Sequence, residues 1–162
     1  VSAAVSIPTI ASGGFATGGG LVAALALGAS AINMGTRFVA TAEAAVHENV
    51  KQQIVDNTER DTTLVFRKFR NTARVARNAI SEEIRRIEEQ EGTTFEDIAH
   101  LASGARGREN VLDKGLMDDG MWWTGQSQGL ITEVLTCQQV VDQIMGEAVE
   151  LIDRRLPGLR TV

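Results

Sequence analysis

The sequence predicts an α/β fold, and two observations support that prediction. The first forty residues contain only one charged side chain, that of Arg37, so nearly all of this stretch is expected to be buried. Within it, a strand pattern, a glycine turn, a helix pattern and a second strand pattern follow in order. Such a unit pairs its strands in parallel through a right-handed crossover. Continuous apolar strands are typical of a parallel sheet covered on both faces, or of the inner wall of a barrel.

The expected boundaries of this unit follow from its glycines and its proline. The first strand is predicted at residues 7–11, with Pro8 near its start, where a missing N–H is tolerated. The helix is predicted at residues 19–27, ended by Gly28, and the second strand at residues 31–34. Two strands do not make such a sheet, and the remaining sequence offers few further candidates. We therefore expect the partner strands to lie outside this sequence.

The middle of the chain predicts helices and one short strand. Residues 43–56 place Val46, Val50 and Ile54 four residues apart, which indicates a helix. Residues 62–66 alternate weakly, as a short strand does. Apolar residues then recur every three or four positions and predict one amphipathic helix over residues 72–90: Ala73, Ala76, Ile80, Ile84 and Ile87.

The last part of the chain predicts a short helix at residues 95–102, an ordered glycine-rich loop at 104–129 and a final helix. That helix begins at Thr136, which forms a capping box with Gln139, and it is stopped by Pro157 and Gly158. Its predicted buried stripe consists of Val140, Val141, Ile144, Met145, Ala148, Val149 and Ile152. The expected organisation is a βαβα part at 1–57, a mainly helical and loop region at 58–135, and a C-terminal helix at 136–162 that packs back on the first part.

Composition excludes several classes of protein. A formal net charge of −5 argues against nucleic acid or an anionic membrane as the main partner, and no apolar run is long enough to span a bilayer. The lone Cys137 cannot form an intramolecular disulfide and points to a reducing compartment, so a cytoplasmic location is expected. The chain begins at Val1 with neither an initiator Met nor a signal peptide, which predicts a fragment or a processed product.

The candidate site consists of two glycine turns at the carboxyl ends of the predicted strands. The first contains Ser12, Gly13 and Gly14, and the second contains Asn33, Met34, Gly35 and Thr36. Glycine lets backbone N–H groups approach a phosphate closely, and a following helix N-terminus favours an anion. Adjacent parallel strands would place both turns around one phosphate. A dinucleotide fingerprint fits less well, because Asn33 and Met34 stand where an acidic residue is required, and no Walker motif occurs.

At these residues the sequence resembles the nitronate monooxygenase (2-nitropropane dioxygenase-like) family. Residues 7–38, I-P-T-I-A-S-G-G-F through N-M-G-T-R-F, resemble the end of that family's flavin-binding barrel. V-H-E-N-V-K-Q-Q-I at 46–54, F-R-N-T-A-R-V at 69–75 and W-x-x-G-Q-x-x-G-L-I at 122–131 resemble its later segments.

The resemblance implies an FMN-dependent oxidoreductase that oxidises alkyl nitronates with O2. It implies the last two strands of a TIM (β/α)8 barrel, with both glycine turns holding the FMN phosphate. The family's catalytic His would precede Val1, so no catalytic residue is expected here. Two alternatives remain open. One is an enoyl-acyl carrier protein reductase-like flavin barrel, which a requirement for NAD(P)H would distinguish from a nitronate monooxygenase. The other is a catalytically inactive half-barrel with a structural role. In either case we expect self-association or pairing with the upstream barrel half.

The remaining candidate residues have ordinary structural interpretations. His47 and His100 are interpreted as surface or helix-packing residues, without a second ligand at the spacing that a metal needs. Trp122 and Trp123 either pack in a core or wall a substrate pocket, and Arg37 is either paired or directed at the phosphate. A basic cluster forms a solvated face or binds a phosphate-bearing cosubstrate: Arg67, Lys68, Arg70, Arg74 and Arg77.

Overall fold

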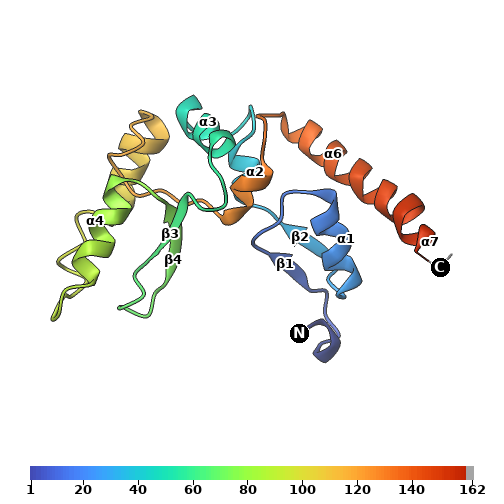
Figure 1. The fold of residues 1–162 in the computed structure, drawn as a ribbon, viewed down its shortest axis with the longest axis horizontal. Helices are drawn as coiled ribbons and strands as arrows, with labels where there is room; N and C mark the ends of the chain where they lie inside the picture. The colour runs from blue at the N-terminus through green and yellow to red at the C-terminus, as the bar shows by residue number, and fades with distance from the viewer. Residues whose placement is uncertain (160–162) are drawn as a thin grey trace.

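The computed structural model describes residues 1–159 as an α/β protein with the shape of an arch (Figure 1). One arm of the arch contains a β-hairpin and helix α4, and the other contains a parallel strand pair with helices α1 and α6. Within the described residues there are two sheets of two strands each. No helix in this part of the chain combines the length and the apolar composition needed to cross a bilayer.

The predicted strand-helix-strand unit is present. Strand β1 (Ile10–Ser12) pairs in parallel with β2 (Ala31–Asn33), with Ile10 opposite Ala31, and helix α1 (Gly18–Ala26) connects them. Strand β1 begins later than predicted, because Pro8 has no N–H to donate. A short 3-10 helix, Ser2–Ala4, precedes it.

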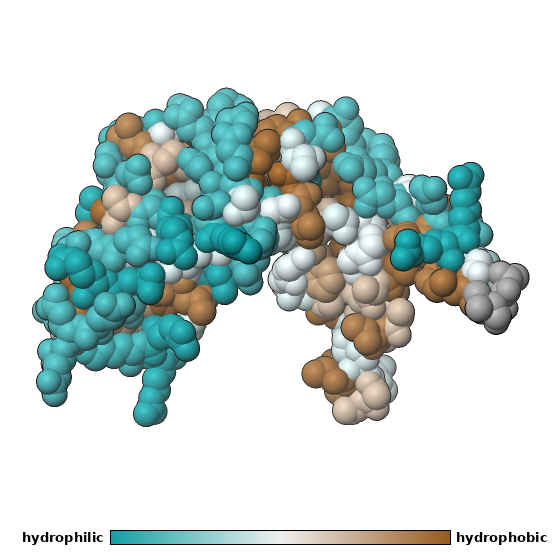
Figure 2. Space-filling model, in the orientation of Figure 1, coloured by the Kyte–Doolittle hydropathy of each residue, from teal (hydrophilic) through white to brown (hydrophobic). Residues whose placement is uncertain are grey.

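The prediction that nearly all of residues 1–40 are buried is wrong for this structure. Ile10 is 64% exposed and Leu27 is 83% exposed, and neither strand has a fully buried residue. The physical reason is that β1 and β2 pair only with each other among residues 1–159, so both outer strand edges are open, although α1 packs against β2. Figure 2 shows the resulting apolar surface over the N-terminal segment.

Two short helices follow β2. Helix α2 (Thr36–Val39) begins directly after Gly35, and α3 (Glu48–Asp56) begins later than the predicted helix at 43–56. The delay has a local cause, since the His47 side chain caps α3 by accepting a hydrogen bond from the Asn49 N–H at 3.1 Å. Val50 and Ile54 of α3 are fully buried, as their spacing predicts.

The next segment forms a hairpin, and its second strand lies where the first turns of a helix were predicted. Strand β3 (Thr62–Val65) was expected, and it pairs antiparallel with β4 (Ala73–Ala76). Helix α4 (Ala79–Glu88) begins at the Asn78 cap, so the helix predicted at 72–90 is wrong over its first turns. Ala73 and Ala76 alone do not distinguish a helix from a strand. Pairing with β3 and burial of Val75 decide for the strand.

The remaining connection is partly helical. Residues 95–102 form turns instead of the predicted helix, with the Asp97 carboxylate accepting the Thr94 N–H at 2.8 Å. The predicted loop at 104–129 contains helix α5 (Gly104–Arg106), a π-helical segment Gly107–Asp113 and the first part of a 3-10 helix Gln126–Leu130. The prediction of an ordered loop therefore underestimated its helical content.

Helix α6 (Cys137–Glu150) has the predicted capping box of Thr136 and Gln139. It continues through a π-helical segment Leu151–Arg155 into α7 (Leu156–Gly158), so Pro157 and Gly158 do not end it where predicted. Proline is tolerated there because it lies in the first turn of α7. Only three of the seven residues of the predicted stripe are buried, because α6 packs on α1 with a single face. Val140, Ile144 and Ala148 are buried, whereas Val141, Met145, Val149 and Ile152 are exposed.

Two apolar clusters hold the arch together. One lies beneath the hairpin and includes Val65, Val75 and Ile84. The other connects α3 with the 122–131 segment and includes Ile54 and Trp122. The hairpin arm therefore has its own core, separate from the exposed parallel strands.

Candidate anion-binding site

The two predicted glycine turns lie side by side. The register of β1 and β2 places Ser12 opposite Asn33 at the carboxyl ends of both strands. The Asn33 side-chain amide donates a hydrogen bond to the Ser12 hydroxyl oxygen at 3.1 Å. The structure thus brings together the residues that sequence reasoning placed at one edge of the sheet.

The glycines leave this edge open. Gly13 and Gly14 have φ of +91° and +83°, in the left-handed region that favours glycine. A Cβ placed on Gly13, Gly14 or Gly35 would meet no atom within 4 Å. The Gly14 and Gly35 N–H groups donate to no acceptor within residues 1–159. Donors on an open edge fit a phosphate, so these residues are compatible with the predicted FMN phosphate.

Thr36 connects this edge to a distant segment. Its hydroxyl oxygen accepts a hydrogen bond from the Gly125 N–H at 2.9 Å, across 89 positions of sequence. The hydroxyl keeps its own hydrogen for a second partner. A Cβ on Gly125 would lie 3.3 Å from the Thr36 oxygen, a tight contact that would require the hydroxyl to shift. Sequence reasoning did not assign Gly125 to the site, although it stands in the W-x-x-G-Q segment that carries the resemblance.

The N-terminus of α1 is already occupied by a carboxylate. The Gly18 N–H donates a hydrogen bond to Glu147 of α6 at 2.7 Å. A carboxylate at this position interacts favourably with the helix dipole. The favourable dipole expected from the helix after Gly14 is therefore engaged within the protein, and the glycine N–H groups remain as the open donors of the first turn.

Arg37 is buried beside this region and is incompletely bonded. It is 5% exposed, and its Nη1 donates a hydrogen bond to the backbone carbonyl of Glu133 at 3.1 Å. Its Nη2 has no hydrogen-bond partner in the described residues. Burial lowers the pKa of the Arg37 guanidinium below its usual range, and the Glu133 charge opposes that shift. Among residues 1–159, no carboxylate lies within 4.0 Å of the Arg37 guanidinium nitrogens.

The two histidines and the cysteine have structural surroundings. His47 caps α3 and packs against Gly115, where a Cβ would overlap its ring. His100 is exposed. The Cys137 N–H donates to both oxygens of the Glu43 carboxylate, at 3.0 and 2.9 Å. Within residues 1–159 no three metal-ligating side chains lie together.

The two tryptophans differ in their surroundings. Trp122 is buried in the cluster around Ile54, as core packing predicts. Trp123 is 63% exposed, and both tryptophans line an apolar cavity of about 280 Å³ together with Val39, Leu112 and Met121. Trp122 therefore belongs to the core and to the wall of this cavity, whereas Trp123 lies at the cavity wall and at the surface.

The fold is that of an α/β protein with a parallel strand pair and a separately packed hairpin arm. Its candidate site lies at the carboxyl ends of the two parallel strands, where the glycine turns are open to solvent. The family model described as "Nitronate monooxygenase" matches residues 1–147, and the chain belongs to this family of oxidoreductases.

Two curated relatives and one solved structure illustrate the similarity. A (3aS,4S,5R,7aS)-5-hydroxy-7a-methyl-1-oxo-octahydro-1H-indene-4-carboxyl-CoA dehydrogenase of Rhodococcus jostii is 30% identical, over 93% of this chain and 52% of its own length. A probable nitronate monooxygenase of Staphylococcus haemolyticus is 31% identical, over 96% of this chain and 42% of its own. FabK from Thermotoga maritima superposes with a TM-score of 0.87 and 37% identity, over 98% of this chain and 49% of its own. The chain thus spans about half the length of these proteins.

Proposed function

We propose that this chain supplies the flavin-phosphate-binding portion of an FMN-dependent nitronate monooxygenase, which oxidises alkyl nitronates or nitroalkanes with O2. The observation that supports the proposal most directly is the open strand edge, where Gly13, Gly14 and Gly35 leave room for an anion. Membership of the nitronate monooxygenase family supplies the chemical class. When bound, FMN would supply the redox chemistry that no side chain of this chain provides.

In this proposal each residue of the edge has a defined task. The N–H groups of Gly14 and Gly35 donate to the phosphate oxygens, and the Thr36 hydroxyl donates its remaining hydrogen. Ser12, Asn33 and Met34 complete the two turns. The bond from Gly125 to Thr36 fixes the rotamer of that hydroxyl, so that its hydrogen is directed away from Gly125.

The rest of the flavin site would be formed by the preceding half of the same barrel fold. Two findings support this choice of partner: the chain spans about half of its relatives, and the parallel strand pair is incompletely buried, with Ile10 of β1 64% exposed and Ile32 of β2 half-buried. Strands with unpaired edges and apolar faces associate readily with further strands. The base that takes a proton from the substrate would come from that half as a histidine.

A second candidate is an enoyl-acyl carrier protein reductase-like flavin enzyme. It is favoured by the basic cavity on the hairpin arm, because a reductase needs to hold a phosphate-bearing nicotinamide cosubstrate. A third, the inactive half-barrel with a structural role, is favoured by the same exposed strands that predict a partner.

One experiment separates the three candidates. The chain is combined with the part of the Staphylococcus haemolyticus relative that it does not cover, and FMN is added. Oxygen uptake with an alkyl nitronate, without any nicotinamide nucleotide, is the expected result. Oxidation of NAD(P)H with an enoyl thioester and no response to the nitronate would select the second candidate. A stable complex without either activity would select the structural role.

A further inference from the structure

A strongly basic cavity is lined by residues of the β3–β4 hairpin and α4. Figure 1 shows these elements on the arm of the arch opposite strands β1 and β2. The cavity has a volume of about 530 Å³, within the range of small-molecule sites. Five cationic side chains line it against two carboxylates, Glu88 and Glu89; the cations are Arg67, Lys68, Arg74, Arg77 and Arg85. In a chain of net charge −5, this concentration of positive charge creates a local potential that attracts anions.

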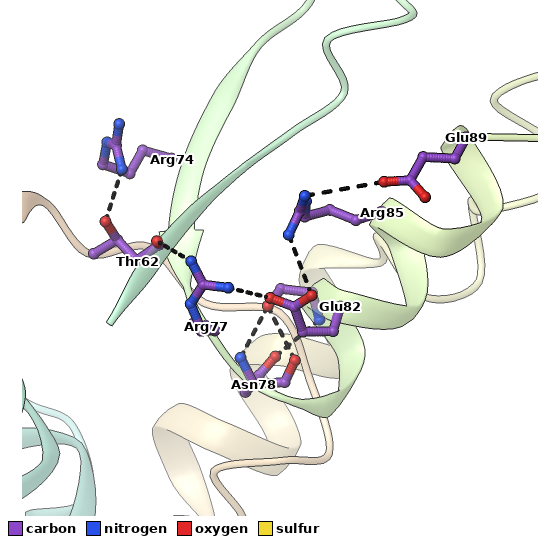
Figure 3. A network of polar contacts seen from close by, with 8 residues as sticks. Thr62, Arg74, Arg77, Asn78, Glu82, Arg85 and Glu89 are labelled. Carbon is purple, nitrogen blue, oxygen red and sulfur yellow. Dashed lines mark hydrogen bonds and ion pairs between the residues drawn. The ribbon is translucent and has the colours of Figure 1, made fainter. Parts of the chain in front are cut away.

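The positive charge of the cavity is only partly compensated. Arg77 and Arg85 share the Glu82 carboxylate, at 2.8 and 3.2 Å, as Figure 3 shows. Neither Arg67 nor Arg74 has a carboxylate within 4.0 Å in the described part of the chain. Two guanidinium groups at this cavity are therefore available to an anion.

The Arg74 guanidinium is held in position before any ligand binds. Its Nη1 donates a hydrogen bond to the hydroxyl of Thr62 at 2.7 Å, across the hairpin (Figure 3). Thr62 is itself buried, so this anchor does not move freely. A planar guanidinium fixed at one nitrogen keeps its other N–H groups for bidentate contact with phosphate oxygens.

The loop that carries Arg67 and Lys68 is also fixed. Phe66 has φ of +64°, which a bulky residue seldom adopts, and it is buried in the cluster beneath the hairpin. The Phe95 ring packs edge-on against Phe66 and Phe69, with centroids 5.9 Å apart in both pairs. A backbone held in an uncommon conformation on the rim of a cavity is typical of ligand-binding loops.

Glu88 adds a carboxylate to the wall of the cavity, beside the arginines. A ligand that combines phosphate groups with hydroxyl or amine donors would contact the arginines through its phosphates and the Glu88 carboxylate through its donors.

We propose that this cavity binds the phosphate groups of a nucleotide-type ligand. Arg67 and Arg74 contact the phosphates, and Glu88 accepts a hydrogen bond from a ribose hydroxyl or a base amine. This site is separate from the glycine edge and does not depend on the flavin. Two sources share the chemistry: a nicotinamide nucleotide with a 2′-phosphate, and a coenzyme A thioester with a 3′-phosphate.

Calorimetric titration of the chain with pyrophosphate, ADP, 2′,5′-ADP and 3′,5′-ADP tests the proposal. We expect saturable binding of ADP, and a preference between the two bisphosphates that identifies the source. Arg74→Gln and Arg67→Gln each weaken binding by about tenfold, the effect of one charged hydrogen bond. Arg60→Gln is the matched control, because Arg60 is exposed, lies outside the cavity and carries the same charge. Circular dichroism verifies that each variant is folded.

Two further variants test the role of Glu88 and the location of the bound phosphate. Glu88→Met should strengthen pyrophosphate binding by removing a negative charge, while reducing the preference for ADP over pyrophosphate. A purely structural Glu88 would not change that ratio. Binding that persists in Gly14→Val cannot occur at the glycine edge. The proposal is overturned if no probe binds saturably, if Arg60→Gln weakens binding as much as Arg74→Gln, or if Gly14→Val abolishes binding.

Discussion

Gly13 and Gly14 place two consecutive residues in the left-handed region of backbone space. For an L-residue with a Cβ, that conformation costs roughly 1–2 kcal/mol. The cost is conformational here, because no neighbouring atom would touch an added Cβ. The same open space leaves the Gly14 N–H accessible. Glycine therefore allows both the positive φ that the turn needs and the close approach of an anion to the backbone.

Gly14→Val is expected to abolish FMN retention by the chain. Its branched side chain would fill the space in front of the donors and strain the turn. Gly92→Val is the matched control, because Gly92 also has a positive φ, +78°, and open surroundings, and it lies just beyond the end of α4. Quenching of flavin fluorescence measures both variants. Equal loss of FMN in both would show that backbone strain, not a phosphate site, accounts for the result.

In the hairpin arm, local sequence patterns predicted helix α4 correctly but did not predict strand β4. The second half of the predicted amphipathic helix was correct, because Ile80 and Ile84 define one buried face of α4. The first half failed, because Ala73 and Ala76 become a strand only through pairing with β3. A propensity pattern carries no information about a partner strand, whereas the capping box of Asn78 and Ser81 is local and marks the start of α4.

Asn78→Ala should lower the free energy of unfolding by about 2 kcal/mol, from a lost cap and two carbonyls left without their donor. The Asn78 amide donates to the carbonyls of Met117 and Gly120 at 2.7 and 2.9 Å, and its oxygen accepts the Ser81 N–H. Asn78→Ser keeps the helix cap but not the two bonds to the carbonyls, so it should lower the free energy of unfolding by less. Asn71→Ala, at an exposed position, is the control, within about 0.5 kcal/mol of the parent. Urea denaturation measures all three. Equal stability of the alanine and serine variants would contradict the capping role.

The start of α6 should make stability depend on pH. Glu43 accepts the Cys137 N–H, and this bond lowers the pKa of its carboxyl below the ordinary value of 4.5. A carboxyl whose pKa is lower in the folded than in the unfolded protein contributes its full stabilisation at pH values above the unfolded-state pKa. This stabilisation is lost as the pH falls through the folded-state pKa. Glu43→Gln should therefore lower the melting temperature at pH 7, and the difference should narrow below about pH 4. A constant difference across this range would contradict it. Glu91→Gln, at another exposed glutamate, is the charge-matched comparison.

At the scale of the whole molecule, the strand edge was predictable and its surroundings were not. The sequence places Ser12 and Asn33 at neighbouring strand ends because a parallel unit is a short-range pattern. The contacts of Thr36 with Gly125 and of Gly18 with Glu147 span 89 and 129 positions, and no local pattern reports them. The sequence analysis did not include Arg85 in the basic cluster for the same reason, because Arg85 belongs to α4 and reaches the hairpin only in the folded protein.

The last prediction is that the 162-residue chain alone does not turn over nitronates. In the described residues the edge offers donors for a phosphate, but no histidine of this chain lies at it, since His47 caps α3 and His100 is exposed. A positioned acid–base group contributes about 10²–10⁴-fold. The exposed apolar strands should also make the isolated chain self-associate, which light scattering measures. Oxygen uptake with FMN and an alkyl nitronate should be absent for the chain alone and restored on mixing with the preceding half of a relative. Turnover near that of a full-length relative, without that half, would show that the chain holds a complete site.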